Sequence, residues 1–484
     1  DVAEKYNEKM MEAVAEASEE LTDKYLETME LSKEDISKGL KLGLVNNKFR
    51  PLFTLSSTKN IGVDVLMSTV VNYFPRYSDL NPFEAGDTKL KRSEDEKLAG
   101  LFFKTFSDQH LGNINTAKLI SGKLESGDEF FNPQKNISEK SGQLYAPIGN
   151  DRESVDGASA GDIVSFAKLK ETETGDIITE EGSGVNFETI EYPTPIYSVA
   201  LIPESKEDTE KIATGLKKLN KEDPSFEFKM DKEFGDFILS GMGDSHLNTA
   251  LSKAKNRFGV EVGTTNPQVP YRETVTKKSS AHFRYKKQSG GRGQFGEVDL
   301  SVEPGKENFE FVNNIVGGVI PKNFIPSVEK GVKGAMVSGV IAGYPVINIK
   351  VVLFDGSYHT VDSSDMAFQI AGSKGFKKAC ESAAMVLLEP VYDFKITVPE
   401  ENLGDVMGDL SGRRGKIQGT EQKRGKSVVI AKAPLAEMFT YINSLKSMTG
   451  GRGFYTMKFS HYEKVPQNNA QKIVQAKQKE AEEE

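Results

Sequence analysis

Hydrophobic positions along the chain follow two different periods, and the period changes several times. In residues 1–50 apolar side chains recur every three or four positions, which is typical of helices that bury one face. The clearest series is Tyr6, Met10, Met11, Val14 and Ala15. These first 50 residues are therefore predicted to be helical, with acidic residues on the exposed faces.

A strand, a loop and a helix are predicted directly after this helical region. Ser32 precedes Glu34 and Asp35 and is expected to cap the last of the first helices. Residues 51–56 read as a buried strand, and residues 63–73 as an apolar helix that ends before a proline. This order is typical of the end of an α/β domain.

The pattern becomes all-β between about residues 81 and 192. Short apolar runs are separated by Gly, Asp, Ser and Asn, as expected for many short strands joined by turns. The predicted strands include residues 101–106, 115–120 and 161–167. Their number and spacing favour a β-barrel.

Two later regions each predict the order β-α-β-β-α-β, which is a ferredoxin-like sandwich. In residues 193–272 the expected strands are 197–202, 225–230, 237–240 and 260–262, with helices at 206–219 and 244–258. In residues 391–466 the expected strands are 391–398, 415–419, 428–433 and 454–459, with helices at 403–410 and 435–445.

The segment between the two sandwiches contains a polar loop that follows a strand. Val346 to Leu353 is apolar and rich in β-branched residues, so it is predicted to be a strand. Asp355-Gly356 predicts a tight turn. Ser357 to Ser364 then carries hydroxyl groups and His359 but almost no side chain to bury. Taken alone, this pattern also fits a solvated hairpin.

A basic run precedes that loop. Residues 277–292 contain no acidic residue and six cationic ones: Lys277, Lys278, Arg284, Lys286, Lys287 and Arg292. Phe283 and Tyr285 lie between them, so the run could neutralise phosphates and stack on unpaired bases. It could equally be the exposed face of a basic strand.

Gly291, Gly293 and Gly296 satisfy the nucleotide-binding spacing G-x-G-x-x-G, but a dinucleotide site requires a helix after the glycines. Residues 297–302 instead alternate with period two, as in a strand. We therefore expect a hairpin that presents backbone N–H groups, Arg292 and Gln294 to a large polyanion. The sequence contains no phosphate-binding loop, no metal-ligand spacing and no catalytic triad pattern, so neither a catalytic residue nor a metal is predicted.

Composition sets the remaining bounds. The 484 residues are 37% hydrophobic and 27% charged, which indicates a globular chain of three to five domains. The net charge of -9 argues against general coating of nucleic acid but leaves local basic faces possible. Cys380 is the single cysteine, which fits a reducing compartment. No apolar run approaches the length of a membrane span. Because the chain begins at Asp1, we expect it to be cut from a longer polypeptide.

Several motifs resemble bacterial translation elongation factor G, and they occur in order along nearly the whole chain. They are Lys221 to Phe226, Gly241 to Leu247, Pro267 to Thr274, Gly291 to Gly296, Gly317 to Pro321, Ala342 to Pro345, Gly356 to Ser364, Leu388 to Pro390, Gly404 to Leu410 and Arg413 to Gly415. Phe459 to Tyr462 and Ser363 to Gln369 look closest to the second, paralogous form of that factor.

The resemblance implies a multidomain α/β and β fold. The expected parts are the end of the G domain with its helical insertion (1–80), the domain II β-barrel (81–192), the domain III ferredoxin-like sandwich (193–272), an S5-like α/β domain IV (273–390) and the domain V ferredoxin-like sandwich (391–466). The C-terminal helix, residues 467–484, is expected to return to domain IV.

The resemblance also implies functional residues. The tip of domain IV, which enters the decoding centre of the small ribosomal subunit in this family, corresponds to Gly290, Gly291, Arg292, Gly293, Gln294, Ser357, Tyr358, His359 and Asp362. Basic residues expected to face ribosomal RNA are Lys286, Lys287, Arg413, Arg414 and Lys416. Ser56, Ser57 and Thr58 correspond to the guanine loop, where the family usually has Ser-Ala.

The family's nucleotide machinery is otherwise missing from the sequence. The phosphate-binding loop, both switch regions and the N-K-x-D motif do not occur, so the chain should not bind or hydrolyse GTP by itself. GTP and Mg²⁺ are implied only for the full-length parent, which is expected to be a translational GTPase.

Three functions are compatible with these features. The first is promotion of tRNA–mRNA translocation, with the ribosome (16S and 23S rRNA and the stalk proteins), tRNA and mRNA as partners of a cytoplasmic monomer. The second is a ribosome-protection or ribosome-recycling factor of the same architecture. The third, from another class, is an acidic scaffold that binds only proteins. The Gly356–Ser364 loop favours translocation.

Overall fold

A computed structural model describes residues 2–108, 112–149, 151–203, 206–288, 293–423 and 425–483. Its contacts divide the chain into two compact units. The first comprises residues 1–193, 206–226 and 254–260, and the second comprises residues 194–205, 227–253 and 261–484. Among the described residues, no helix has the length and apolar character needed to cross a membrane.

Four helices form the N-terminal region: α1 (Val2–Ala15), α2 (Glu19–Thr28), α3 (Lys33–Val45) and α4 (Val63–Tyr73). The apolar positions at helical spacing form a small core that includes Val14 and Leu21. The predicted cap is confirmed, because the Ser32 side chain accepts the backbone N–H of Asp35 at 3.1 Å. A short 3-10 helix, η1 (Tyr77–Asp79), follows α4.

The predicted buried strand at residues 51–56 is wrong. The segment has a single backbone bridge, between Ser56 and Ile61, and the Leu52 side chain is 95% exposed. An apolar run forms a strand only where a neighbouring strand accepts its backbone hydrogen bonds. No strand among the described residues pairs with residues 51–55. The helix that follows was predicted with its observed ends.

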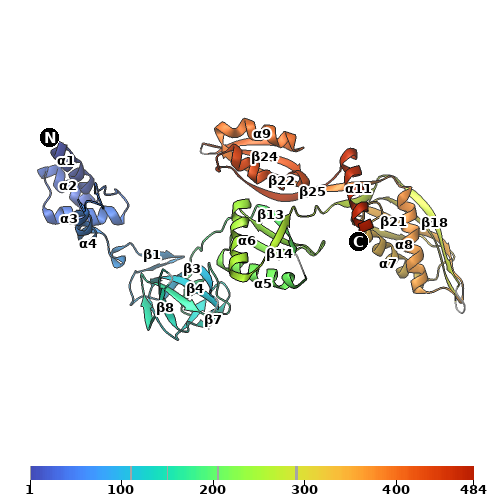
Figure 1. Cartoon of the computed structure of the whole chain (residues 1–484), viewed down its shortest axis with the longest axis horizontal. Helices are drawn as coiled ribbons and strands as arrows, with labels where there is room; N and C mark the ends of the chain where they lie inside the picture. The colour runs from blue at the N-terminus through green and yellow to red at the C-terminus, as the bar shows by residue number, and fades with distance from the viewer. Residues whose placement is uncertain are drawn as a thin grey trace. The chain divides into compact units, whose positions relative to one another are not determined.

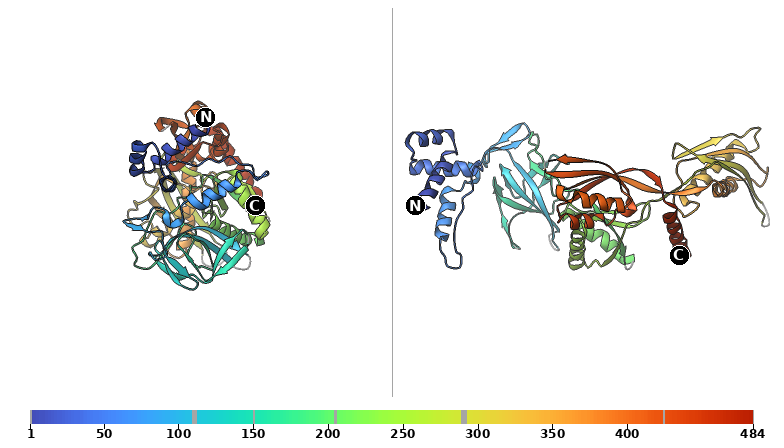
Figure 2. Two further views of the ribbon diagram at one scale, coloured as in Figure 1. Left: turned by 90° about the vertical axis from the view of Figure 1, so that its left-hand side faces the viewer. Right: turned by 90° about the horizontal axis from the view of Figure 1, so that it is seen from above.

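The described residues between 83 and 179 form twelve strands. Figure 2 shows this region from two sides. They are β1 (Phe83–Ala85), β2 (Thr88–Leu90), β3 (Ala99–Asp108), β4 (Gly112–Ser121), β5 (Lys123–Glu125), β6 (Glu129–Asn132), β7 (Ile137–Lys140), β8 (Leu144–Ile148), β9 (Asp151–Val155), β10 (Gly157–Ser159), β11 (Ile163–Ala167) and β12 (Ile177–Thr179). The main sheet has the order β7-β6-β12-β3-β4-β11-β8-β9, an open path among the described residues. Phe102, Phe130 and Phe166 meet at its core with ring centroids 5.0 to 5.9 Å apart.

The first βαββαβ prediction is confirmed. The elements are β13 (Tyr197–Pro203), α5 (Lys206–Glu222), β14 (Glu227–Met230), β15 (Phe237–Gly241), α6 (Asp244–Phe258) and β16 (Val262–Thr265). The sheet order is β14-β15-β13-β16. The ends of α6 are those predicted from the sequence, whereas β16 begins two residues later than expected.

Domain IV places two helices on one side of a four-stranded sheet (Figure 1). Its elements are β17 (Arg272–Val275), β18 (Ser279–Lys287), β19 (Gln294–Pro304), β20 (Phe309–Asn313), η2 (Lys322–Phe324), α7 (Ile325–Ser338), β21 (Ile349–Ser357) and α8 (Asp365–Glu381). The order is β18-β19-β21-β20, with β20 parallel to β21. Helices α7 and α8 cross closely at Gly331, where a Cβ would overlap the backbone of Gln369.

The tight turn predicted at Asp355-Gly356 is wrong, because both residues continue strand β21. Asp355 pairs with Asp299 and Gly356 pairs with Val298, beyond a bulge in the register. Glycine is required here for a different reason. A Cβ at Gly356 would overlap the Glu297 carbonyl oxygen and lie 2.6 Å from the Ile320 side chain.

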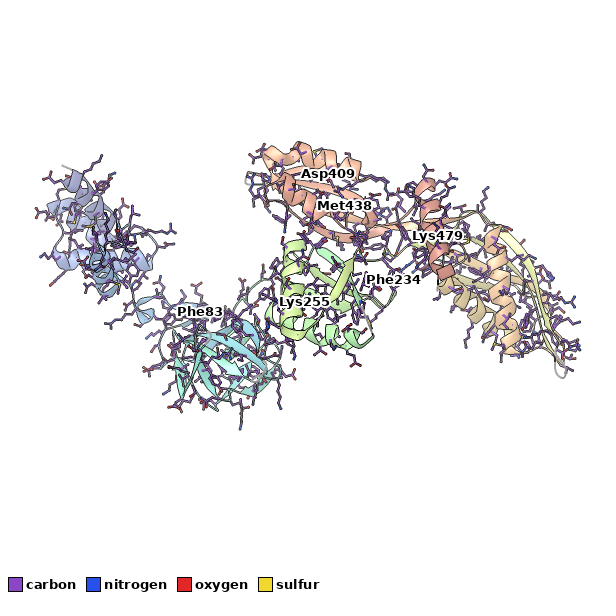
Figure 3. The ribbon with its side chains drawn as sticks, viewed as in Figure 1. Phe83, Phe234, Lys255, Asp409, Met438 and Lys479 are labelled. Carbon is purple, nitrogen blue, oxygen red and sulfur yellow. The ribbon has the colours of Figure 1, made fainter. Side chains whose placement is uncertain are left out.

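The second βαββαβ prediction is also confirmed. The elements are β22 (Met385–Pro399), η3 (Glu400–Asn402), α9 (Leu403–Gly412), β23 (Lys416–Lys423), β24 (Lys426–Pro434), η4 (Leu435–Glu437), α10 (Tyr441–Met448) and β25 (Phe454–Lys464). The helix expected at 435–445 divides into η4 and α10. Figure 3 labels Asp409 on α9 and Met438, which follows η4.

The sheet of domain V has the order β17-β22-β24-β23, with β25 also on β22, so the first strand of domain IV joins it. The C-terminal helix α11 (Gln467–Glu483) follows β25 (Phe454–Lys464). Its Ala470, Ile473 and Val474 pack against a cluster that includes Tyr344 and Leu387.

Candidate nucleic-acid interface

One aspartate joins the two tip segments of domain IV. The Asp362 carboxylate accepts the backbone N–H of Gly293 at 3.1 Å, and its backbone carbonyl accepts the N–H of Phe295 at 2.9 Å. The loop after β21 is therefore fastened to the start of β19. Gly290, Gly291 and Arg292 lie outside the described residues.

Ser363 supports the same junction, although the sequence did not single it out. Its side chain is buried, accepts the backbone N–H of His359 at 2.9 Å, and donates to the Phe295 carbonyl at 3.0 Å. The next residue, Ser364, caps α8 by accepting the N–H of Ala367. Two consecutive serines before a helix are the signal in the sequence that could have indicated this position. Only one of them is needed to cap the helix, so the hydroxyl of the other can bond to a different segment.

One ring nitrogen of His359, Nδ1, has hydrogen-bond partners within the described part of the chain. Nδ1 accepts the backbone N–H groups of Val361 and Asp362 at 3.3 and 3.2 Å. Nδ1 also lies 3.4 Å from Oδ2 of Asp362. In the neutral tautomer in which Nδ1 accepts the two backbone N–H groups, the ring proton is on Nε2. The side chain is 54% exposed, so Nε2–H can donate to a phosphate or a ribose hydroxyl.

The remaining tip side chains offer contact surface and hydrogen bonds. Tyr358 and Val361 are 44% and 57% exposed, and Ser357 is half-buried. The hydroxyl of Tyr285 donates to Oε1 of Gln294 at 2.9 Å, which leaves the Gln294 amide nitrogen as the group that can donate to a ligand. Polar contacts rather than a hydrophobic core thus hold the tip, as its composition suggested.

The interleaved aromatics of the basic run do not face a ligand. Phe283 and Tyr285 point into the domain IV core, because alternate residues of β18 face opposite sides of the sheet. The expectation that they stack on bases is wrong. Arg284 on the open side pairs with Glu297 at 3.1 Å. Lys286 and Lys287 are exposed and form no ion pair within the described part of the chain.

The basic residues near the end of α9 form ion pairs with carboxylates of this chain. Arg413 pairs with Asp409 at 2.8 Å. Arg414 binds both oxygens of Glu389, at 2.6 and 2.8 Å, and this contact raises the pKa of the Arg414 guanidinium. Lys416 pairs with Glu463 at 2.6 Å but stays 65% exposed. Their expected role in facing ribosomal RNA stays a prediction, with Lys416 the most accessible of the three.

The residues expected to correspond to the guanine loop lie in a polar turn. Oγ of Ser56 lies 3.4 Å from Oγ1 of Thr58, and it accepts the N–H of Lys59 at 3.4 Å. Ser57 and Thr58 are exposed. A turn of this kind offers hydroxyl and backbone groups to a base edge. That these residues meet a guanine base stays a prediction.

Comparison with known proteins assigns this architecture. Four family models match: Elongation factor G domain 2 at residues 97–181, Elongation Factor G domain III at 192–266, Elongation factor G domain IV at 267–384 and Elongation factor G C-terminus at 386–473. A crystal structure of a protein from Thermus thermophilus is 38% identical, with a TM-score of 0.76, over 97% of this chain and 69% of that one. The chain therefore belongs to the elongation factor G family and carries domains of a ribosome-binding translation elongation factor.

Proposed function

We propose that this chain is the ribosome-binding part of a factor that promotes tRNA–mRNA translocation, with the tip of domain IV entering the decoding centre. The observation that carries the proposal is the fastening of both tip segments by Asp362, beside a His359 side chain that is 54% exposed. A preorganised donor of this kind loses little conformational entropy when it meets an RNA groove.

The proposed partners are the ribosome, through 16S and 23S rRNA and the stalk proteins, together with tRNA and mRNA. The tip side chains bind and orient RNA and perform no chemistry. GTP and Mg²⁺ belong to the full-length parent, in which residues 56–58 would meet the guanine base and the nucleotide would supply the timing of movement.

A toeprint on pretranslocation ribosomes tests the proposal. The full-length polypeptide is added with GTP, with GDP and without nucleotide, as the wild type and as His359→Ala. The matched control is His282→Ala, because His282 is equally exposed at 54% but lies on β18 away from the tip. We expect His359→Ala to slow the one-codon advance about tenfold or more, the effect of losing one hydrogen bond to a charged group, and His282→Ala to leave it unchanged.

The outcomes separate the candidate functions. An advance only with GTP indicates GTP-driven translocation. An advance under every nucleotide condition indicates that the domains in this chain bias the ribosome's own movement. Binding without advance would refute translocation and favour protection or recycling. An unchanged advance in the His359 variant would refute the role of His359 in the tip, and absence of ribosome binding by the wild type would favour the protein-binding scaffold.

A further inference from the structure

A fully buried carboxylate lies where domain IV joins the sheet of domain V. The Glu273 side chain is 0% exposed, and in the described part of the chain no cationic side chain pairs with it. Its two oxygens instead accept four backbone N–H groups from one loop. Oε2 accepts those of Val340 and Ile341 at 2.7 and 2.9 Å. Oε1 accepts those of Ala342 and Tyr344 at 2.7 and 3.3 Å.

This arrangement suits an ionised carboxylate. Such a group has about four acceptor positions and no donor, so the four N–H groups satisfy the Glu273 side chain completely. Convergent backbone N–H groups also turn the positive ends of their dipoles toward the charge, which offsets the cost of burying it. A glutamine would direct its own NH₂ group at some of these donors and lose their hydrogen bonds.

The strand that carries Glu273 belongs to the sheet of domain V, whereas the loop belongs to domain IV. Strand β17 pairs with β22, and Glu273 lies opposite Leu387. The loop, residues 339–347, follows α7, and its Val346 packs in the domain IV core. The backbone of Glu273 also donates to the Pro345 carbonyl at 3.0 Å and accepts the N–H of Ile347 at 2.9 Å. We call Glu273 and residues 339–347 the brace.

The chain itself crosses between the two domains at two places. One crossing, residues 276–278, joins β17 to β18, and the other, residues 382–384, joins α8 to β22. They lie side by side, because the N–H groups of Thr276 and Lys277 both donate to the Ala383 carbonyl, at 3.3 and 3.0 Å. Short segments that end regular elements are the usual sites of hinges. The brace adds an attachment that is separate from both crossings in the sequence.

The brace also supports the C-terminal helix. Its Ala342 and Tyr344 pack in the cluster that includes Ile473 and Val474 of α11. The loop turns back tightly at Gly339, where φ is 66° and a Cβ would lie 2.6 Å from the backbone of Tyr344. The carboxylate therefore holds the loop, and the loop contributes to the surface on which α11 packs.

A small rotation at this junction would become a large displacement at the tip. Strand β18 begins directly after the first crossing and ends opposite Gln294 of the tip. Its nine residues span about 27 Å at 3.3–3.4 Å per residue. A rotation of about 10° at the crossings would therefore move the tip by about 5 Å. Hydrogen bonds resist such a rotation more strictly than apolar contacts do, because they require a direction as well as a distance.

We infer that Glu273 is a positioning residue for translocation: its carboxylate fixes the angle between domain IV and the domain V sheet and so determines where the tip is presented. The inference rests on the proposed function and goes beyond it, because Glu273 is buried outside the tip and acts only through the loop. A purely stabilising role makes a different prediction. Any variant that destabilises domain IV to the same extent would then slow translocation equally.

Distances between two spin labels test the brace in the absence of ribosomes. The labels are attached through Thr360→Cys in the tip loop and Lys426→Cys in domain V, both exposed positions, whereas the native Cys380 is buried. Double electron–electron resonance on the whole chain should show a distance distribution about 5 Å wider in Glu273→Gln than in the wild type. The matched control, Val298→Ala, shortens a buried side chain of the domain IV core and should leave the width unchanged.

The consequence for translocation is measured by the toeprint, with the full-length polypeptide and GTP. Glu273→Gln should slow the one-codon advance about tenfold, because losing one hydrogen bond to a charged group lowers the braced population by about that factor. The affinity for ribosomes should change by no more than about twofold, since the tip side chains are intact. Val298→Ala should advance at the wild-type rate, although faster hydrogen exchange in β21 shows that it is less stable.

A second variant covers the case in which Glu273→Gln does not fold. Glu273→Asp keeps the charge but is one methylene shorter, so it cannot reach all four N–H groups, and an intermediate width is expected. An unchanged width in the folded Glu273 variants would overturn the inference, and so would a wider distribution with a normal advance. If the wild type itself does not advance the ribosome, the translocation function fails, while the labels still show whether Glu273 fixes the angle between the domains.

Discussion

Replacing Arg414 by alanine should destabilise domain V, because it leaves a buried carboxylate without its counter-ion. The Glu389 side chain is 5% exposed, and Arg414 holds both of its oxygens at 2.6 and 2.8 Å. Arg414 also binds Glu437 at 2.9 Å. Without the guanidinium, the Glu389 charge must remain buried without a counter-ion or take up a proton.

The magnitude follows from the burial of the pair. Removing one partner of a fully buried ion pair costs about 3–5 kcal/mol. Arg414 itself is 29% exposed, so water can partly replace it, and we expect a loss near the lower limit, about 3 kcal/mol. The backbone contributes little to the difference. Arg414 has a φ of 59°, and alanine carries the same left-handed strain because it has the same Cβ.

Hydrogen exchange of the whole chain, followed by mass spectrometry, measures this loss locally. A change of about 3 kcal/mol corresponds to roughly 100-fold faster exchange in the protected amides of β22 and β24. The variant Glu389→Leu/Arg414→Met replaces the pair with apolar side chains and should be close to wild type in protection. Exchange within threefold of wild type in Arg414→Ala would refute the reasoning. A double variant that is stable but binds ribosomes poorly would show that Arg414 also contacts RNA.

Three further predictions concern other buried groups. Burial alone would raise the pKa of Glu222, but hydrogen bonds from Arg257 and the Ser107 N–H outweigh it and lower the pKa. The stability that this carboxylate contributes is therefore present above its unfolded pKa and lost on acidification. Amides of β3 and of the end of α5 should exchange faster below about pH 4. In the variant Glu222→Gln this acid-induced increase in exchange should be absent. The buried Tyr441 hydroxyl has no hydrogen-bond partner among the described residues. The variant Tyr441→Phe should therefore leave the protection of α10 amides against hydrogen exchange unchanged or raise it by about 1 kcal/mol. A clear loss of this protection would contradict the prediction. Burial raises the pKa of Cys380 to about 12, so a thiol reagent at pH 8 should label it only after denaturant is added, and rapid labelling of the native chain would show that the core opens.

Local signals predicted most of the elements correctly. Ser32 caps its helix as predicted, because a short polar side chain accepts the free N–H groups of a helix start in any context. Both βαββαβ orders were readable because each strand and helix shows its own period. The prediction of a strand at residues 51–56 was wrong, because a strand needs backbone hydrogen bonds to a neighbouring strand, and the sequence of the segment alone does not show whether such a strand exists.

The candidate site divides in the same way. The polar composition of Ser357 to Ser364 was visible in the sequence, whereas the assignment of Gly293 and Gln294 to the tip came from the family resemblance and stays a prediction. Its fastening was not, because Asp362 and Gly293 are 69 positions apart and meet only through strand pairing.

By itself, then, the sequence of this protein determined its elements, their order and the chemical character of its loops, because these depend on neighbours within a few residues. Tertiary structure decided which charges remain available. The sequence does not show that Arg413 and Arg414 are paired, yet Arg413 meets the carboxylate of Asp409 and Arg414 meets that of Glu389 on β22. Lys395 and Lys458, which no local motif marks, remain unpaired among the described residues. Ion pairing depends on distances between residues far apart in the chain, and only folding sets those distances.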